Sequence, residues 1–293
     1  MQHDRSDSRR RRRVGAQAGG AAALAVAAIL ASGLAGVPSG RLIAATLPPA
    51  AAAPSPATHL PALAPVTAST LGGSTPAAAR NPGGLGWYSS NWAGYAVAGG
   101  PYSSVGAQWT VPAVRASYRG SFSALWVGID GFTSSALIQA GTEADYFNGA
   151  AHYSAWWEIL PAPAVTIRTL SVRPGDRMSV TITRVSSGRW RIVVKDARSG
   201  SYATTRAYTG SASSAEWIEE APIVSGRTTL LAAHSTIVFD HVSLDGGNPG
   251  LVSLDAGAMI RRGFLVDTPS APDADADGFA LAEQATSPPR PRS

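Results

Sequence analysis

Apolar and polar residues alternate in several short runs of this chain. Such alternation is typical of β-strands that bury one face and expose the other. The side chains that we expect to face inward are Met178, Val180 and Ile182, then Trp190, Ile192 and Val194, and then Ile237, Phe239 and His241. Turn signals separate the runs, at residues 174–176, 187–188, 199–200 and 245–247. Convincing helical periodicity is absent, so the pattern predicts an all-β antiparallel sandwich or barrel.

Residues 1–45 have the layout of a secretory signal peptide. A block of arginines, Arg9 to Arg13, precedes an apolar run from about Ala21 to Leu34, and Ala45 is one candidate cleavage point. An uncleaved membrane anchor is the alternative, but the apolar run only approaches the roughly 20 residues that a spanning helix needs. We therefore expect a secreted, extracellular protein with no membrane association after signal removal.

Two further segments have compositions typical of disordered chain. Residues 46–86 are dominated by Ala, Pro, Ser, Thr and Gly, which predicts a propeptide or linker. Residues 266–293 are similar in composition, which predicts a disordered C-terminal tail. The folded domain should therefore cover residues 87–265, where all eight Trp lie.

Charge and composition exclude several classes of function. The formal net charge is +5, and residues 1–45 account for all of it because they hold seven Arg against two Asp. The neutral remainder gives no reason to expect a nucleic-acid partner. The chain has no Cys, which excludes disulfides, thiolate metal sites and a cysteine nucleophile. G-x-S-x-G, H-E-x-x-H and phosphate-loop motifs are also absent.

Acidic and amide side chains instead occur inside apolar, tryptophan-rich segments, at residues 126–141, 153–161 and 215–220. Burying such groups is costly unless they are paired or functional. In an extended strand Glu216 and Glu220 share one face, about 13 Å apart by strand rise, while Glu219 points to the other face. Because that separation is too large for a dyad, Glu220 needs a partner from another strand. Gln139 is the natural candidate, since an amide can donate to a developing oxyanion.

These segments resemble the glutamic peptidases, or eqolisins, and we expect a bacterial, secreted member of that family. The resemblance covers about residues 88–245 in the family's order. Its motifs are SNWAG (90–94), QWTVP (108–112), WVGIDG (126–131), ALIQAG (136–141), YSAWWEILP (153–161) and AEWIEE (215–220).

The resemblance implies a concanavalin A-like sandwich of two large antiparallel sheets, as in lectins and glucanases, with a substrate cleft on one sheet. It implies an acid endopeptidase in which Gln139 and Glu220 are the catalytic pair. Trp126, Asp130 and Glu158 fall at positions that line or support the family's site, and we expect Trp92 at the cleft. The family is made with a propeptide and needs neither metal nor cofactor. We expect a monomer that acts on polypeptides and is insensitive to pepstatin.

The chain departs from the family pattern at a few positions. Fungal members have disulfides, an Asp where this chain has Ser154, and aromatic residues where it has Ile159 and Leu160. An alternative function is a carbohydrate-binding or glycan-hydrolysing sandwich, but only Glu143 and Asp145 match the three spaced acids typical of glucanases. An inactive binding domain is a third alternative, and Glu158 could be a structural acid.

For the peptidase we expect Glu220 to take a proton from a water held near Gln139. That water would attack the scissile carbonyl, the Gln139 amide would donate to the oxyanion, and Glu220 would protonate the leaving nitrogen. A Glu220 pKa near 4 would suit an acid optimum.

Overall fold

The computed structural model describes residues 84–224, 227–284 and 288–292. The expected signal peptide and residues 46–83 of the expected propeptide lie outside this part of the chain. Within the described residues the only helical element is a short 3₁₀ turn, η1 (Ser253–Asp255), so the all-β prediction is confirmed. No helix of that part is long and apolar enough to cross a membrane.

The first of two layers contains the strands that hold the site. In spatial order it consists of β8 (Val165–Thr166), β7 (Ala150–Ile159), β6 (Ile138–Phe147), β5 (Ala124–Ile129), β12 (Ser214–Glu220), β2 (Trp92–Ala98), β17 (Ala256–Arg261) and β1 (Trp87–Ser89). Neighbouring strands are antiparallel except for the parallel pair β1 and β17.

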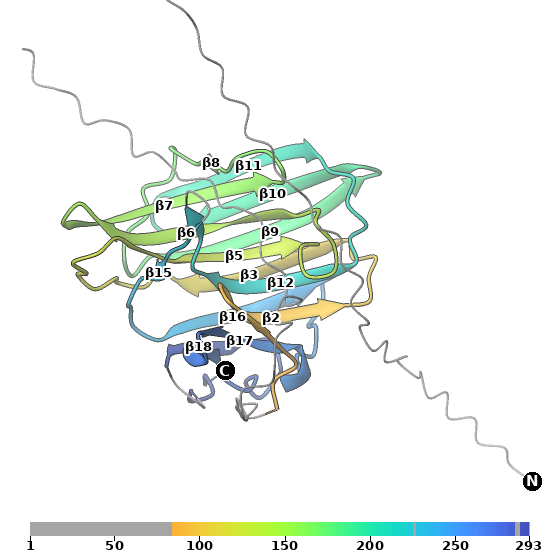
Figure 1. Cartoon of the computed structure of the whole chain (residues 1–293). Helices are drawn as coiled ribbons and strands as arrows, with labels where there is room; N and C mark the ends of the chain where they lie inside the picture. Colours follow the sequence, from red (N-terminus) through yellow and green to blue (C-terminus); the bar gives the residue numbers. More distant parts are fainter. Residues whose placement is uncertain (1–83, 225–226, 285–287, 293) are drawn as a thin grey trace, which may run out of the picture. The chain divides into compact units, whose positions relative to one another are not determined.

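The second layer packs against the first (Figure 1). In spatial order it consists of β11 (Gly200–Ala207), β10 (Arg189–Asp196), β9 (Arg177–Ser186), β3 (Ser104–Thr110), β16 (Ile237–Leu244), β19 (Phe279–Glu283) and β18 (Phe264–Pro269). Because β18 also pairs with β17, the two layers are joined along one side. Short pairs flank the layers: β4 (Ser121–Phe122) with β15 (Leu230–Leu231), and β13 (Ile223–Val224) with β14 (Arg227–Thr228).

A hydrophobic core fills the space between the layers, and the alternating runs supply much of it. The predicted inward residues of β9 and β10 are all buried, as are Ile237 and Phe239 of β16. His241 was predicted to face inward, and this prediction is wrong. The register of β16 shifts between Asp240 and Ser243, and His241 adopts a positive φ of 48°. The bulge changes the phase of the alternation, so Val242 is buried and His241 is exposed.

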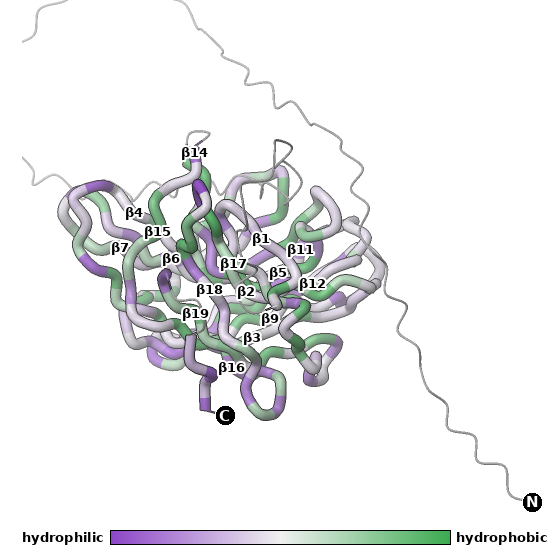
Figure 2. Tube along the Cα trace, turned by 60° about the horizontal axis from the view of Figure 1, so that its bottom comes forward, coloured by the Kyte–Doolittle hydropathy of each residue, from purple (hydrophilic) through white to green (hydrophobic). Residues whose placement is uncertain are grey.

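The prediction that residues 266–293 form a disordered tail is also wrong for the first part of that segment. Residues 264–269 form β18 and residues 279–283 form β19. Phe279 stacks on Phe239 with ring centroids 5.1 Å apart, so the segment fills part of the core. Figure 2 shows β18 and β19 beside β2 and β16 in the body of the domain. The Asp-, Ala- and Pro-rich composition between the two strands concealed them.

The N-terminal boundary of the domain also moves. Leu85 is buried in the core, and the Gly86 N–H donates to the Ala256 carbonyl at 2.9 Å. The folded domain therefore begins at Leu85 rather than Trp87 and continues at least to Glu283.

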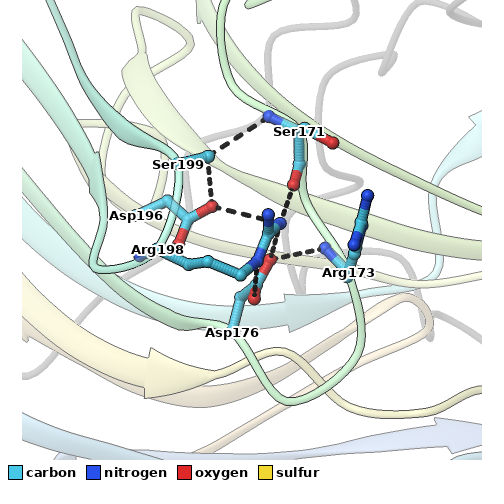
Figure 3. A network of polar contacts seen from close by, with 6 residues as sticks. All are labelled: Ser171, Arg173, Asp176, Asp196, Arg198 and Ser199. Carbon is cyan, nitrogen blue, oxygen red and sulfur yellow. Dashed lines mark hydrogen bonds and ion pairs between the residues drawn. The ribbon is translucent and has the colours of Figure 1, made fainter.

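An ion-pair network fixes the turns at one end of the second layer (Figure 3). The Arg198 guanidinium donates to both oxygens of Asp176, each at 2.7 Å, and also to the Ser171 carbonyl. Ser199 donates to Asp196 in the same turn. The network joins the turn before β9 to the turn between β10 and β11, and it involves none of the predicted site residues.

Candidate active site

The central strand of the site is β12, which lies between β2 and β5. Trp217 belongs to the core between the layers, and its indole N–H donates to the Gly106 carbonyl of β3 at 2.9 Å. Ile218 packs instead in a second cluster, on the face of the first layer that points away from this core. Strand alternation puts Glu216 and Glu220 on the face of Ile218, and Glu219 on the core side. The predicted facing of this segment is therefore confirmed.

Gln139 and Glu158 are direct cross-strand partners on β6 and β7. The Gln139 Nε2 donates to Glu158 Oε2 at 2.6 Å, and both side chains are buried. The Gln139 Oε1 accepts no hydrogen bond within the described residues. Glu158 thus fixes the orientation of the amide whose N–H group is the candidate oxyanion donor.

Glu220 is held by two N–H donors from neighbouring elements. Asn91 Nδ2 donates to Oε1 and Trp126 Nε1 donates to Oε2, each at 3.1 Å. Burial raises the pKa of Glu220 to about 8, and the negative charge of Glu158 adds to the increase, while the N–H groups of Trp126, Trp92 and Asn91 oppose it. The expected pKa near 4 is therefore wrong, because that value applies to a solvated carboxyl group.

Trp126 lies between the two candidate catalytic residues. β5 separates β12 from β6, and Trp126 faces Ile218 on one side and Gly141 on the other. A Cβ at position 141 would lie 2.7 Å from Trp126 Cβ and 1.9 Å from the Leu125 carbonyl oxygen, so glycine is required for this close approach. The Trp92 ring meets the Trp126 ring edge-on, with centroids 4.9 Å apart. Trp92 thus packs against the indole that donates to Glu220.

Gln139, Glu158 and Glu220 influence one another on this face of the first layer, although not all of them are in direct contact. Gln139 donates to Glu158 rather than to Glu220, and the Glu158 charge in turn acts on the pKa of Glu220.

Asp130 supports the site from the end of β5. Its carboxylate accepts hydrogen bonds from the Tyr208 hydroxyl at 2.7 Å and from the backbone N–H groups of Ala212 and Ser213 at 2.8 and 2.9 Å. Burial raises the pKa of Asp130, but these hydrogen bonds outweigh burial and the net pKa is lowered. The ionised carboxylate fastens the segment that leads into β12, so its role here is structural.

Two buried polar residues had no role in the sequence prediction, and of the two only Asn91 donates to Glu220. Asn91 lies in the SNWAG motif, directly before Trp92, and its contact with Glu220 spans 129 positions of the chain. Glu216 is fully buried and accepts the Phe132 N–H at 3.3 Å, and burial raises its pKa well above the usual value. The alternating AEWIEE segment predicted the facing of Glu216 but not its partner.

In the described residues the one group of three acidic side chains close enough to share a cation is Asp240, Asp273 and Asp277. It lies on β16 and the segment before β19. None of these residues belongs to β5, β6, β7 or β12, which hold Gln139, Glu158 and Glu220.

Comparison with known proteins assigns the family. The model of the Peptidase A4 family matches residues 90–262, which is more than half of the chain and includes every candidate site residue. The chain belongs to the Peptidase A4 family. It is therefore a glutamic-type endopeptidase, a hydrolase whose substrates are polypeptides.

Individual relatives agree with this assignment. Aspergillopepsin-2 of Aspergillus niger is 27% identical over 226 residues, which cover 68% of this chain and 75% of that protein. The structure of scytalido-glutamic peptidase with a transition-state analogue inhibitor matches this chain with a TM-score of 0.56 at 22% identity. The match covers 66% of this chain and 98% of that one. SCP-B, an eqolisin solved with the tripeptide Ala-Ile-His, has a TM-score of 0.53 at 21% identity over the same shares. The two structures establish the predicted sandwich fold.

Proposed function

We propose that this peptidase is a secreted acid endopeptidase whose catalytic pair is Gln139 and Glu220. In the ionised form Glu220 takes a proton from a water molecule, and the water oxygen attacks the carbonyl carbon of the scissile peptide bond. The Gln139 amide donates to the oxyanion that forms. When the C–N bond breaks, the proton on Glu220 moves to the leaving nitrogen, which yields a carboxylic acid and an amine.

The observation that supports this pair is the environment of Glu220. It is a fully buried carboxyl group that has N–H donors on both oxygens and faces the side of the layer where Gln139 lies. Burial strengthens a carboxylate as a base, because its pKa of about 8 lies far above the ordinary value.

The neighbouring residues have supporting roles in this proposal. Glu158 holds the Gln139 amide, and Trp126 and Trp92 shape the surface around Glu220. Asp130 anchors the segment before β12 and does not contact substrate. No metal or cofactor takes part.

The test is a comparison of Glu220→Gln with Glu216→Gln. Both residues are buried carboxyls on the same face of β12, so the two variants make the same chemical change on the same strand. We expect kcat for a denatured protein substrate to fall about 10²–10⁴-fold in Glu220→Gln, since general acid–base help is lost, and to stay within a few fold in Glu216→Gln. Equal losses in both variants would contradict the assignment of Glu220.

Gln139→Ala should lower kcat by about 10²–10³-fold with a smaller effect on KM, because the amide binds an oxyanion that exists only in the transition state. Gln108→Ala, a change of the same kind on β3 of the other layer, is the control. A variant at position 139 that raises KM alone would show that Gln139 binds substrate without stabilising the oxyanion.

We further propose that residues 1–45 direct secretion and that the segment before Leu85 is a propeptide removed by self-processing in acid to give a monomeric enzyme. Because Leu85 is part of the core, the cut should fall between about Pro76 and Gly84. Incubating the purified precursor at pH 3 and sequencing the new N-terminus tests this, with Glu220→Gln as the uncut control. A full-length chain that already digests substrate would exclude the propeptide role.

A further inference from the structure

Three ionisable side chains meet on the core side of the catalytic strand, directly behind Glu220. They are Glu219 of β12, His234 of the segment before β16, and Asp267 of β18. All three are buried, and Glu219 and Asp267 are completely so. The proposed mechanism uses none of them, and Asp267 lies beyond the part of the chain that matches the family.

The contacts of His234 define its charge. Its Nε2 lies 2.5 Å from Glu219 Oε1, and its Nδ1 lies 2.6 Å from the Ser235 carbonyl oxygen. Both neighbours are hydrogen-bond acceptors, so both ring nitrogens must donate, and the ring is an imidazolium. The carboxylate of Glu219 raises the pKa of His234 to about 10, against burial, which lowers it.

The contacts of Asp267 define where a proton must lie. Neither Asp267 oxygen, nor Glu219 Oε2, accepts a hydrogen bond of normal geometry within the described residues, and the Thr268 backbone N–H acts on the Asp267 carboxyl only as a minor influence. Yet the two carboxyl groups lie close enough for each to act on the pKa of the other. Two ionised carboxylates are both acceptors, so this contact is satisfied only if one of them is protonated.

The charges decide which of the two carboxyls holds the proton. Burial raises the pKa of Glu219, but the positive charge and hydrogen bond of His234 outweigh it, so the net pKa is lowered. Burial, followed by the negative charge of Glu219, raises the pKa of Asp267 well above its usual value. The proton therefore resides on Asp267.

Other ionisable groups on the surrounding elements do not replace this proton. On β19, Glu283 is the register partner of Asp267, and its Oε1 accepts the His234 backbone N–H at 2.5 Å. On β17, the Arg261 guanidinium donates to the carbonyls of Ser90 and Thr229. On the side of β5, Ser123 donates its hydroxyl to Glu219 Oε1 at 2.9 Å and its N–H to Asp145.

We propose that Glu219, His234 and Asp267 form a proton-holding support for the catalytic strand, which ties β12 to the C-terminal strands in acid and weakens as pH rises. The support joins three segments that are distant in sequence. It acts on folding and does not depend on the roles proposed for Gln139 and Glu220.

The sign of the pH dependence follows from each group in turn. Asp267, with a raised pKa, contributes stability fully below its unfolded value of 3.8 and loses it as pH rises. Glu219, with a lowered pKa, contributes above its unfolded value of 4.5 and loses it as pH falls. His234 contributes fully below 6.5 and loses its contribution as pH rises towards about 10. The support is therefore strongest near pH 4.

The test compares the wild-type chain with Asp267→Asn, in which the amide imitates a protonated carboxyl group. Urea unfolding is measured from pH 3 to pH 8, and the unfolding constants of the two proteins are compared as a ratio. We expect the unfolding constant of the wild type, divided by that of the variant, to be constant below about pH 4. Above that pH the ratio should rise by up to tenfold per pH unit, because the Asp267 carboxyl of the wild type loses its proton on unfolding. A ratio that does not change with pH would overturn the proposal.

Asp130→Asn is the control of opposite sign. Asp130 is buried but ionised, so its substitution should destabilise the protein at neutral pH, with an effect that fades in acid. If Asp267→Asn fails to fold, carboxyl ¹³C NMR of the wild-type protein gives the same answer. A protonated Asp267 carboxyl at pH 6 supports the proposal, and a carboxyl that titrates below pH 5 overturns it.

Discussion

Removing the indole N–H of Trp126 tests directly what sets the pKa of Glu220. Trp126 is completely buried, and its Nε1 donates to Glu220 Oε2 at 3.1 Å. Trp126→Phe keeps an aromatic ring against Trp92 but removes this donor. Of the two direct hydrogen bonds to Glu220, only the one from Asn91 then remains. The ionised form of Glu220 loses more than the neutral form, and its pKa must rise.

The size of the rise follows from the strength of the lost bond. A hydrogen bond to a charged group contributes about 1.5–3 kcal/mol, and one pKa unit corresponds to about 1.4 kcal/mol. The pKa of Glu220 should therefore rise by about one to two units. At a pH well below that pKa, the ionised fraction falls tenfold per unit, so kcat/KM should fall about 10–100-fold.

The assay is the pH profile of kcat/KM between pH 2 and pH 8, measured with a denatured protein substrate. Trp156→Phe is the matched control, because Trp156 is buried in the same cluster but comes from β7, whereas the N–H groups that act on the pKa of Glu220 are those of Trp126, Trp92 and Asn91. Both variants lose indole packing, but only Trp126→Phe should move the acid limb to higher pH. Equal shifts in the two variants would refute a specific role of the Trp126 N–H.

Three further predictions concern the buried carboxyls and the reaction class. Glu219→Gln should lower the free energy of unfolding, measured in urea at pH 5, by about 3–5 kcal/mol, because it leaves the His234 charge buried without its partner. An unchanged free energy of unfolding would contradict the ion pair. Glu220→Gln should instead stabilise the protein at pH 7 by about 3 kcal/mol, since the raised pKa of Glu220 makes wild-type stability fall between pH 4.5 and about 8; calorimetry at pH 4 and 7 measures this difference. Pepstatin, EDTA and thiol reagents should not inhibit, and inhibition by EDTA would point to a metal.

The sequence predicted the facing of most strand residues, because period-two alternation is a local property. It placed Glu216 and Glu220 on one face of β12 and Met178, Val180 and Ile182 on the core side of β9. It failed at His241, where a single extra residue in β16 changes the phase. A bulge of this kind depends on the partner strand β3, and alternation within one segment does not reveal it.

The partners of the site residues were less predictable than the residues themselves. Motifs predicted Gln139, Glu158 and Glu220 as candidate site residues, but their hydrogen-bond partners come from other strands and segments of the chain. Asn91 reaches Glu220 over 129 positions, and Gln139 reaches Glu158 only through the pairing of β6 and β7. The pKa of Glu220 depends on burial and on the Glu158 charge, which are properties of the assembled fold.

The sequence also underestimated the C-terminal segment. Composition marked residues 266–293 as a disordered tail, because Asp, Ala and Pro are frequent there. The strands β18 and β19 are short, and their stability comes from pairing with β17 and β16 and from the burial of Phe279. Composition averages over such short elements, whereas Asp267 acquires its environment only through that pairing.

Glu219 and Glu220 show how strand geometry gives one chemical group two opposite behaviours. They are adjacent in β12 and equally buried, so burial alone would raise the pKa of both. Alternation turns Glu219 towards the His234 imidazolium, which lowers its pKa and keeps it ionised as part of the support. The same alternation turns Glu220 towards Glu158, whose negative charge raises its pKa further. One carboxyl is thereby fixed in charge, and its neighbour is left able to exchange a proton, which is the property that the role proposed for Glu220 in peptide hydrolysis requires.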